Sequence, residues 1–397
     1  MINEKTTKLT TVLILGITFM FLANSPFLFG QSSDEIWGPY LTVGEGGSIV
    51  VNWKTAELRQ GEVAYSVASP ADDEVGSEKV ERETGPVQFH HVRLDDLRGG
   101  TEYKYEVNDI GDPSTYYFRS MSEDLREFAF FVYGDNRTCV QRHRILTTWM
   151  AMDRWDPTFI FHTGDLVERP TTSRWADFFW AIEPFSRSTP LVPVLGNHEM
   201  YHQSYFDVFP LPTGDGASMR GWYSFEYGPI NFVILDSNVN EIGLSRFLEQ
   251  TEWLKRELEG QTRKYTVVFF HHPIYSSGYS SGVDTGLAES WGSLFEEHGV
   301  DLVFNGHVHA YERLVKDGVT YVVTGGGGAP TDNISPRLDI SLKARGDSLH
   351  YVRVSVTETG LELETVEVAR VERDGGSGRV GCGAELSGGR KIIDRVK

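Results

Sequence analysis

Two patterns of hydrophobic and polar positions divide the chain. From Trp37 to about Ser120, short segments alternate between apolar and polar residues and are broken by Gly, Pro and Asp. Alternation with period two and frequent turn residues is typical of a small antiparallel β-sandwich. After Glu123 the pattern changes to continuous apolar runs separated by amphipathic stretches. Apolar runs without alternation are typical of strands that are covered on both faces, so we expect an α/β domain there.

The last part of the chain returns to alternation. Residues 350–371 predict a closing β-hairpin, and the glycine-rich stretch after it ends in RKIIDRVK, a candidate final strand. We therefore predict four regions: a leader at residues 1–31, the β-sandwich at 32–121, the α/β domain at 122–372 and a C-terminal tail at 373–397.

The leader is basic at its start and then apolar. Two lysines precede a charge-free stretch from Leu9 to Ser33. This layout is typical of a secretory signal peptide, and the same stretch, if retained, would anchor the chain in a membrane. Either way we expect the rest of the chain in an extracytoplasmic space: secreted, periplasmic or membrane-tethered. In such an oxidising compartment the two cysteines, Cys139 and Cys382, predict one disulfide.

The net charge argues against one class of partner. The chain has 56 acidic and 37 basic residues, which gives a formal charge of -19. Because the nucleic-acid backbone is bound through Lys and Arg, we expect no binding to nucleic-acid duplexes. A small phosphate ester would need local positive charge at its site, and metal ions can supply it.

Polar side chains with metal-binding chemistry follow the ends of five apolar runs. They are Asp135, then Asp165, then Asn197 with His198 and Glu199, then His271 with His272, and last His307 with His309. Ligands of open α/β sheets bind at the carboxyl ends of the strands, so distant segments can converge there. Neighbouring side chains of an extended strand point to opposite faces, so we expect at most one of His271 and His272 to bind metal directly. Carboxylate, amide and imidazole donors together predict a site for Fe, Mn or Zn.

These blocks resemble the signature of a known family. The ordered set GDNR, GDLVE, GNHE, VFFHHP and GHVHAYER is similar to the five motifs of the calcineurin-like metallophosphoesterases. GHVHAYER together with the N-terminal sandwich most resembles the purple acid phosphatase branch, and HHVRLDDLRGGTEYKYEVND looks like the end of a fibronectin type III module. The resemblance implies an α/β (α+β) catalytic domain of two sheets flanked by helices, preceded by an all-β, fibronectin III-like sandwich.

The resemblance also implies a site for two divalent or trivalent metal ions. Carried over position by position, the metal ligands are Asp135, Asp165, Asn197, His271, His307 and His309. Asp165 would bridge both ions. His198 would stabilise the phosphoryl oxygens or protonate the leaving alkoxide, and support of Asn197 is its alternative role. Glu199 would support the ligands rather than bind metal. The implied reaction is in-line attack of a metal-bound hydroxide on a small phosphate ester.

Three positions depart from the family pattern. Purple enzymes have a tyrosine ligand where this chain has Glu168, and broader relatives have a histidine where it has Arg137. Glu168 either binds metal itself or leaves that position to water. Arg137 has only hydrogen-bond donors, so it either clamps a phosphate oxygen or pairs with Glu168 or another acid at the rim. The segment after His272 also lacks the family's substrate-binding histidine, and Tyr275 and Tyr279 are candidates to replace it.

The sequence therefore predicts an exported, metal-dependent phosphatase that hydrolyses phosphate monoesters. A phosphodiesterase of the same family is the alternative, since an altered set of histidines can relax the preference for a terminal phosphate. A second alternative is a catalytically inactive envelope protein that binds or adheres, which the missing tyrosine favours and the retained ligand positions oppose.

Overall fold

The computed structural model describes residues 36–397 apart from 70–77, 109, 112, 123–124, 213–219, 279–281, 337 and 374–378. The leader predicted at residues 1–31 lies outside the described residues, as does Tyr279. In the described part of the chain, no helix is both long and apolar enough to cross a membrane.

The largest sheet combines strands from both ends of the chain. Its strands are β1 (Trp37–Val43), β2 (Ile49–Arg59), β5 (Val87–Leu94), β8 (Phe128–Tyr133), β9 (Phe159–His162), β10 (Leu191–Pro193), β20 (Ser348–Val356), β21 (Leu361–Val371), β22 (Leu386–Ser387) and β23 (Lys391–Val396). Their order is β22-β21-β20-β8-β9-β10-β1-β2-β5, and β23 also pairs with β21. Because β1 pairs in parallel with β10, the N-terminal strands continue the sheet of the α/β region.

A second large sheet faces the first. It consists of β11 (Tyr223–Tyr227), β12 (Ile230–Ile234), β13 (Tyr265–Phe269), β16 (Leu302–Asn305), β17 (Tyr311–Lys316), β18 (Val319–Thr324) and β19 (Ser341–Arg345), in the order β11-β12-β13-β16-β18-β17-β19. Two smaller sheets contain β3 (Glu62–Val67), β4 (Lys79–Arg82), β6 (Glu102–Val107) and β7 (Tyr116–Arg119), and β14 (Tyr275–Ser276) with β15 (Gly282–Val283).

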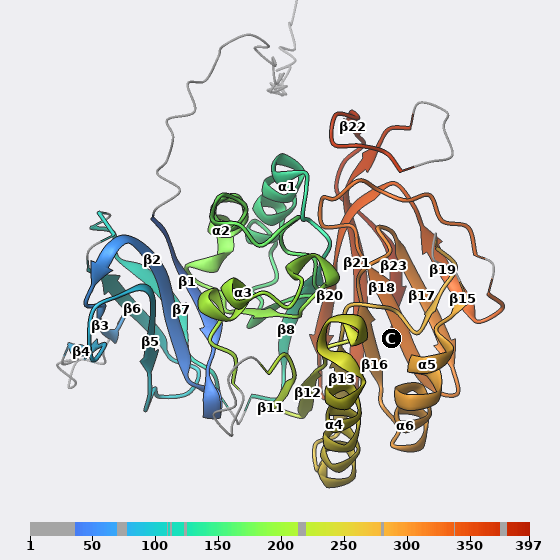
Figure 1. Cartoon of the computed structure of the whole chain (residues 1–397), viewed down its shortest axis with the longest axis horizontal. Helices are drawn as coiled ribbons and strands as arrows, with labels where there is room; N and C mark the ends of the chain where they lie inside the picture. The colour runs from blue at the N-terminus through green and yellow to red at the C-terminus, as the bar shows by residue number, and fades with distance from the viewer. Residues whose placement is uncertain are drawn as a thin grey trace, which may run out of the picture. The chain divides into compact units, whose positions relative to one another are not determined.

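The helices lie along the α/β region of the chain. They are α1 (Val140–Ala151), α2 (Thr172–Ser186), α3 (Gln203–Val208), α4 (Val239–Gly260), α5 (Thr285–Leu287) and α6 (Ser293–Glu297), with a π-helical turn at Ala288–Gly292 and 3-10 turns at Glu45–Gly47 and Asn197–Glu199. Helices α1 and α2 pack side by side (Figure 1).

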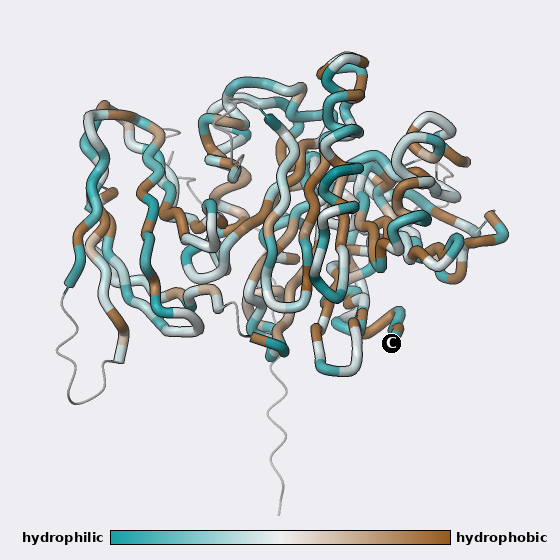
Figure 2. The backbone as a smooth tube through the Cα atoms, turned by 90° about the horizontal axis from the view of Figure 1, so that it is seen from below, coloured by the Kyte–Doolittle hydropathy of each residue, from teal (hydrophilic) through white to brown (hydrophobic). Residues whose placement is uncertain are grey.

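Buried apolar side chains explain why the runs between residues 128 and 324 lack alternation. One cluster fills the space between the two large sheets, where the Phe161 and Phe269 rings stack with centroids 4.1 Å apart. Further clusters join the first sheet to α1 and α2 and the second sheet to α4. The strands are thus covered on both faces, and the brown segments in Figure 2 gather along them. The prediction of two sheets flanked by helices is confirmed.

The N-terminal strands enclose an apolar cluster of their own. Leu41, Val51 and Trp53 of the large sheet pack with Tyr65 and Tyr105 of the four-stranded sheet. Strands β6 and β7 alternate between buried and exposed residues because each buries one face against the opposing sheet. Strand β1 and most of β2 are instead buried on both faces.

Candidate metal centre

Five strand ends carry the candidate ligands. Asp135 follows β8, Asp165 follows β9, Asn197 follows β10, His271 follows β13, and His307 and His309 follow β16. Strands β8, β9 and β10 are parallel to one another in the first sheet, and β13 and β16 are parallel in the second. The carboxyl ends of these strands therefore meet at one edge of the two facing sheets, as expected for a site in an α/β fold.

Four of these side chains form a tight group around Asn197. The side-chain oxygen of Asn197 lies 3.1 Å from Nε2 of His271 and 3.1 Å from Nδ1 of His307. Nε2 of His271 also lies 3.3 Å from Oδ1 of Asp165. One amide, two imidazoles and one carboxylate thus point to a common centre, and together they are a suitable donor set for a transition metal.

A second group contains Asp135 and His309. Nε2 of His309 lies 3.5 Å from Oδ1 of Asp135. The main-chain N–H of His307 donates to both carboxylate oxygens of Asp135, at 2.9 and 3.0 Å. Asp135, Asp165 and His271 also have ligand atoms that all lie within 4.8 Å of one another. The carboxylate of Asp165 therefore lies between the two groups.

The backbone is strained at three of the candidate ligands. Asp135, Asp165 and His307 have φ angles of 59°, 57° and 67°. Such angles are unfavourable for residues other than glycine and concentrate at functional sites. The neighbouring glycines are a steric requirement, since a Cβ on Gly306 would collide with Oδ2 of Asp135.

Hydrogen bonds orient two of the imidazoles as ligands. Nδ1 of His271 donates to the carbonyl of Thr163 at 2.8 Å, and Nδ1 of His309 donates to the carbonyl of Pro330 at 2.6 Å. Each bond places the proton on Nδ1, because a carbonyl can only accept. Nε2 of both rings is then unprotonated and faces the carboxylates, as metal binding requires.

Burial controls the charges of these groups. Burial, and then the charge of Asp165, raises the pKa of Asp135 well above its usual value. Burial lowers the pKa of His271 well below its usual value. The pKa of His309 falls to about 3, through burial and then the nearby charge of Arg379. Neutral imidazoles do not balance the negative charge of the clustered carboxylates. A bound metal ion would supply the missing positive charge, so these residues fit a metal site.

Glu199 organises the loops rather than the centre itself. Its buried carboxylate accepts main-chain N–H bonds from Gly196 at 2.7 Å, Asp165 at 3.1 Å and Val167 at 3.1 Å. These bonds join the loop after β9 to the loop after β10. Burial, and then the charge of Asp165, raises the pKa of Glu199 to about 8.

Arg137 and Glu168 form an ion pair at the rim. Glu168 also accepts a bond from Oγ1 of Thr138 at 2.7 Å, and Nε of Arg137 lies 3.3 Å from Oδ2 of Asp165. Burial alone would raise the pKa of Glu168, but the Thr138 bond and the charge of Arg137 lower it below its usual value. The structure therefore contains the pairing that was one of the two alternatives for Arg137.

His198 is partly exposed and lies beside Asp165. Its Nδ1 donates to the carbonyl of Glu168 at 2.9 Å, and its side chain is 25% exposed. Nε2 lies 3.9 Å from Oδ2 of Asp165, and the main-chain N–H donates to Oδ1 of the same carboxylate at 3.1 Å. The ring thus has one nitrogen fixed by the backbone and one directed toward the carboxylates.

Two assumptions about neighbouring residues do not hold, although the expectation that at most one of His271 and His272 binds metal directly stays a prediction. His272 does not point away from His271, because β13 ends at Phe269 and the pair no longer lies on an extended strand. Nitrogens of His271, His272 and His307 all lie within 4.8 Å of one another. Tyr275 belongs to the apolar cluster behind the second sheet and stacks edge-on against Tyr321, so it is not available to replace a substrate-binding histidine. Turn geometry after a strand is not visible in sequence periodicity.

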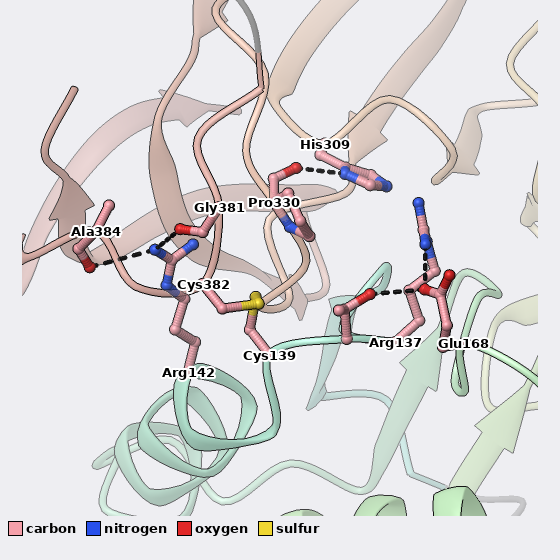
Figure 3. The surroundings of a disulfide bond; sticks show 10 residues. Arg137, Cys139, Arg142, Glu168, His309, Pro330, Gly381, Cys382 and Ala384 are labelled. Carbon is pink, nitrogen blue, oxygen red and sulfur yellow. Dashed lines mark hydrogen bonds and ion pairs between the residues drawn. A yellow bond between two sulfur atoms is a disulfide. The ribbon is translucent and has the colours of Figure 1, made fainter. Parts of the chain in front are cut away.

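A disulfide joins Cys139 to Cys382, with 5.3 Å between the Cα atoms (Figure 3). Cys139 immediately precedes α1 and follows the loop that carries Asp135. Arg142 of α1 donates to the carbonyls of Gly381 and Ala384 on either side of Cys382. The C-terminal segment is therefore fastened to the first metal-site loop by one covalent bond and two hydrogen bonds.

The same segment reaches the His309 side of the site. Val380 pairs with Thr331, and Nε of Arg379 lies 2.9 Å from Oδ1 of Asp332. Asp332 in turn accepts the main-chain N–H of His309 at 3.2 Å. Sequence patterns could not have identified Arg379 or Asp332 as neighbours of the site, because no strand end or motif marks them.

The family model and the similar proteins agree on one family of phosphoesterases. The model of the calcineurin-like phosphoesterase family matches residues 107–311. The chain is 27% identical over 332 residues to phosphoenolpyruvate phosphatase of Allium cepa, and this alignment covers 76% of this chain and 68% of that protein. It is 31% identical over 294 residues to purple acid phosphatase 15 of Arabidopsis thaliana, and this alignment covers 60% of this chain and 53% of that protein. The chain thus spans about half the length of the Arabidopsis relative.

A solved structure shares the fold. Purple acid phosphatase from yellow lupin (Lupinus luteus) seeds superposes with a TM-score of 0.71 at 20% sequence identity. The superposition covers 83% of this chain and 71% of that chain.

Proposed function

Because the chain belongs to the calcineurin-like phosphoesterases, a family of metal-dependent phosphoesterases, we propose that it is an exported phosphatase that hydrolyses phosphate monoesters with two metal ions. The observation that carries the proposal is the arrangement of six donors in two groups that share Asp165. Two separate donor groups with one shared carboxylate are suited to two cations that lie close together.

The ligands divide between two proposed sites. Asp135, Asp165 and His309 would hold one ion. Asp165, Asn197, His271 and His307 would hold the other. Their oxygen and imidazole nitrogen donors suit Fe, Mn or Zn, and the set contains no thiolate that would select a softer metal. When bound, the two ions supply positive charge and an activated water for in-line displacement at phosphorus.

Residues of the chain then orient and protonate the substrate. The Glu168 carbonyl holds His198 with Nε2 on the side of Asp165, where it would face a bound phosphoryl group. When the ester P–O bond breaks, Nε2 of His198 would supply the proton that the leaving alkoxide takes up. Arg137, in its ion pair with Glu168, lies on the same side of Asp165. It would donate to a non-bridging phosphoryl oxygen of the substrate.

Glu168 itself is assigned to the rim. Its carboxylate accepts from both Arg137 and Thr138, which compete with metal for its oxygens. We propose that water completes the first site where purple enzymes place a tyrosine. The enzyme would then be colourless, because no phenolate binds ferric iron.

Export is proposed from the leader and supported by the disulfide. The leader lies outside the described residues, whereas the Cys139–Cys382 bond belongs to the folded chain. A structural disulfide is typical of an oxidising, extracytoplasmic compartment. We further propose that residues 32–121 form a fibronectin III-like module packed against the catalytic domain at residues 122–372, although its strands β1, β2 and β5 extend the catalytic sheet.

A phosphodiesterase is the second candidate. The observation that favours it is the packing of Tyr275 into the core, which removes one candidate contact to a terminal phosphate. The test uses the protein loaded with Mn, Fe or Zn and two chromogenic esters, para-nitrophenyl phosphate and bis(para-nitrophenyl) phosphate. Faster hydrolysis of the monoester supports the first proposal and faster hydrolysis of the diester supports the second. Hydrolysis of neither ester with any of these metals would contradict both and favour an inactive binding protein.

A further inference from the structure

His272 is an imidazole at the centre that the assigned ligand set does not use. Its ring centroid lies 4.5 Å from that of His307 and 4.9 Å from that of His271. Nitrogens of these three rings all lie within 4.8 Å of one another. We propose that His272 is a substrate-contacting residue that donates a hydrogen bond from Nε2 to a phosphoryl oxygen. This inference rests on the proposed phosphatase function.

Ser237 holds His272 in place and has a hydroxyl proton that can set its tautomer. Its Oγ accepts the main-chain N–H of His272 at 2.9 Å and lies 2.9 Å from Nδ1 of the same residue. Oγ has one proton to donate, and in the proposed arrangement it donates that proton to Nδ1. The ring proton then resides on Nε2. A buried serine thus holds the imidazole as a neutral donor.

The surrounding groups separate His272 from the metal ligands. His271 and His309 each approach a carboxylate of Asp165 or Asp135 at 3.3 and 3.5 Å. Among the described residues, no carboxylate oxygen lies within 4.0 Å of a ring nitrogen of His272 in an ion pair. A protonated Nε2 also has no lone pair for a metal. The second site already has four donors without it.

The position of His272 complements the donors on the other side of the centre. Arg137 and His198 lie beside Oδ2 of Asp165, whereas His271, the neighbour of His272, lies beside Oδ1. A phosphoryl group bound at the centre would therefore meet donors from two sides. A terminal phosphate presents more non-bridging oxygens than a diester, so a donor on this second side favours monoesters.

The test compares His272→Leu, which removes the donor, with His272→Gln, whose amide N–H can reach the position of Nε2. His298→Leu is the matched control, since His298 follows α6 at the far end of β16. Each metal-loaded protein is titrated with inorganic phosphate by calorimetry, its metal content is measured, and kcat and KM are determined with para-nitrophenyl phosphate.

We expect His272→Leu to weaken phosphate binding and raise KM about tenfold, the value of one lost hydrogen bond to a charged group, with unchanged metal content. His272→Gln should recover most of the loss, and His298→Leu should match the wild type.

Ser237→Ala provides an independent variant, because it removes the hydroxyl that contacts Nδ1 of His272 and leaves the imidazole ring in place. We expect a smaller loss of phosphate affinity with unchanged metal content. The inference is overturned if His272→Leu binds phosphate as tightly as the wild type, or if it loses metal as a ligand variant would. Failure of the proposed function is a separate result: the metal-loaded wild type would hydrolyse neither ester, while the phosphate titrations would still report on His272.

Discussion

Arg137 donates a hydrogen bond to Glu168, and these are the two positions at which the sequence was expected to depart from the alternative ligands of the family pattern. The two departures from the family pattern are thus coupled to each other. The cation and the anion neutralise one another, so neither leaves an unpaired charge beside the centre.

Replacing Arg137 distinguishes its two roles. If the guanidinium binds phosphate, Arg137→Ala should raise KM for para-nitrophenyl phosphate about tenfold or more, because a hydrogen bond to a charged group contributes about 1.5–3 kcal/mol. Glu168→Gln is the matched variant, since it breaks the same ion pair but keeps the guanidinium. Equal and small effects of both substitutions would show that Arg137 serves only the ion pair.

The disulfide should stabilise the folded chain. It closes a loop between residues separated by 243 positions, and its removal should lower the free energy of unfolding by about 2–4 kcal/mol. Denaturant unfolding of Cys139→Ser, Cys382→Ser and the double variant measures this effect. Reductant should shift the wild type to the same stability and leave the double variant unchanged. A wild type that is insensitive to reductant throughout unfolding would contradict the prediction.

His143 should contribute to acid unfolding. Its Nε2 lies 3.0 Å from the hydroxyl of Tyr133, and burial lowers its pKa from 6.5 to about 3. Because the folded state lowers the pKa, the stability from neutral His143 is present above about pH 6.5 and is lost as the pH falls toward about 3. Over that pH interval, the protonation of His143 should lower the free energy of unfolding by about a few kcal/mol.

The variant His143→Gln removes this titration. The free energy of unfolding of His143→Gln should therefore fall less steeply between about pH 6.5 and pH 4 than that of the wild type. The exposed His202→Gln serves as the control and should keep the wild-type slope. Equal slopes for His143→Gln and the wild type would show that other groups cause the acid sensitivity.

Gly306 should be required for the geometry of the centre. A Cβ at this position would collide with the carboxylate of Asp135, so Gly306→Ala should weaken metal binding about tenfold or more while the β-strands remain folded. Gly360→Ala is the control, because a Cβ there meets nothing within 4 Å. Competition with a chelator measures the metal affinity and circular dichroism measures the fold. Unchanged affinity of Gly306→Ala would contradict the proposed geometry.

Local patterns in the sequence were sufficient to predict the sheets and the convergence of the ligands. Continuous apolar runs such as EFAFFVY and YTVVFF became strands buried on both faces, and the polar residues after them met at one edge. Pairings between distant segments were not predictable, because nothing in β1 specifies β10 as its parallel neighbour. The proposed role of His272 could not be predicted from the sequence, since the direction of its side chain depends on the turn after Phe269 and on Ser237, which lies 35 residues earlier in the chain.

The central claim is that one carboxylate, Asp165, serves two metal ions. The most direct measurement is the metal content per chain, by elemental analysis after loading with Mn or Zn and removal of free metal, for the wild type, His309→Ala and Asp165→Asn. We predict two ions in the wild type, loss mainly of one in His309→Ala, and loss of both together with activity in Asp165→Asn. A wild type with only trace metal, or an Asp165→Asn variant that keeps two ions and full activity, would contradict the account.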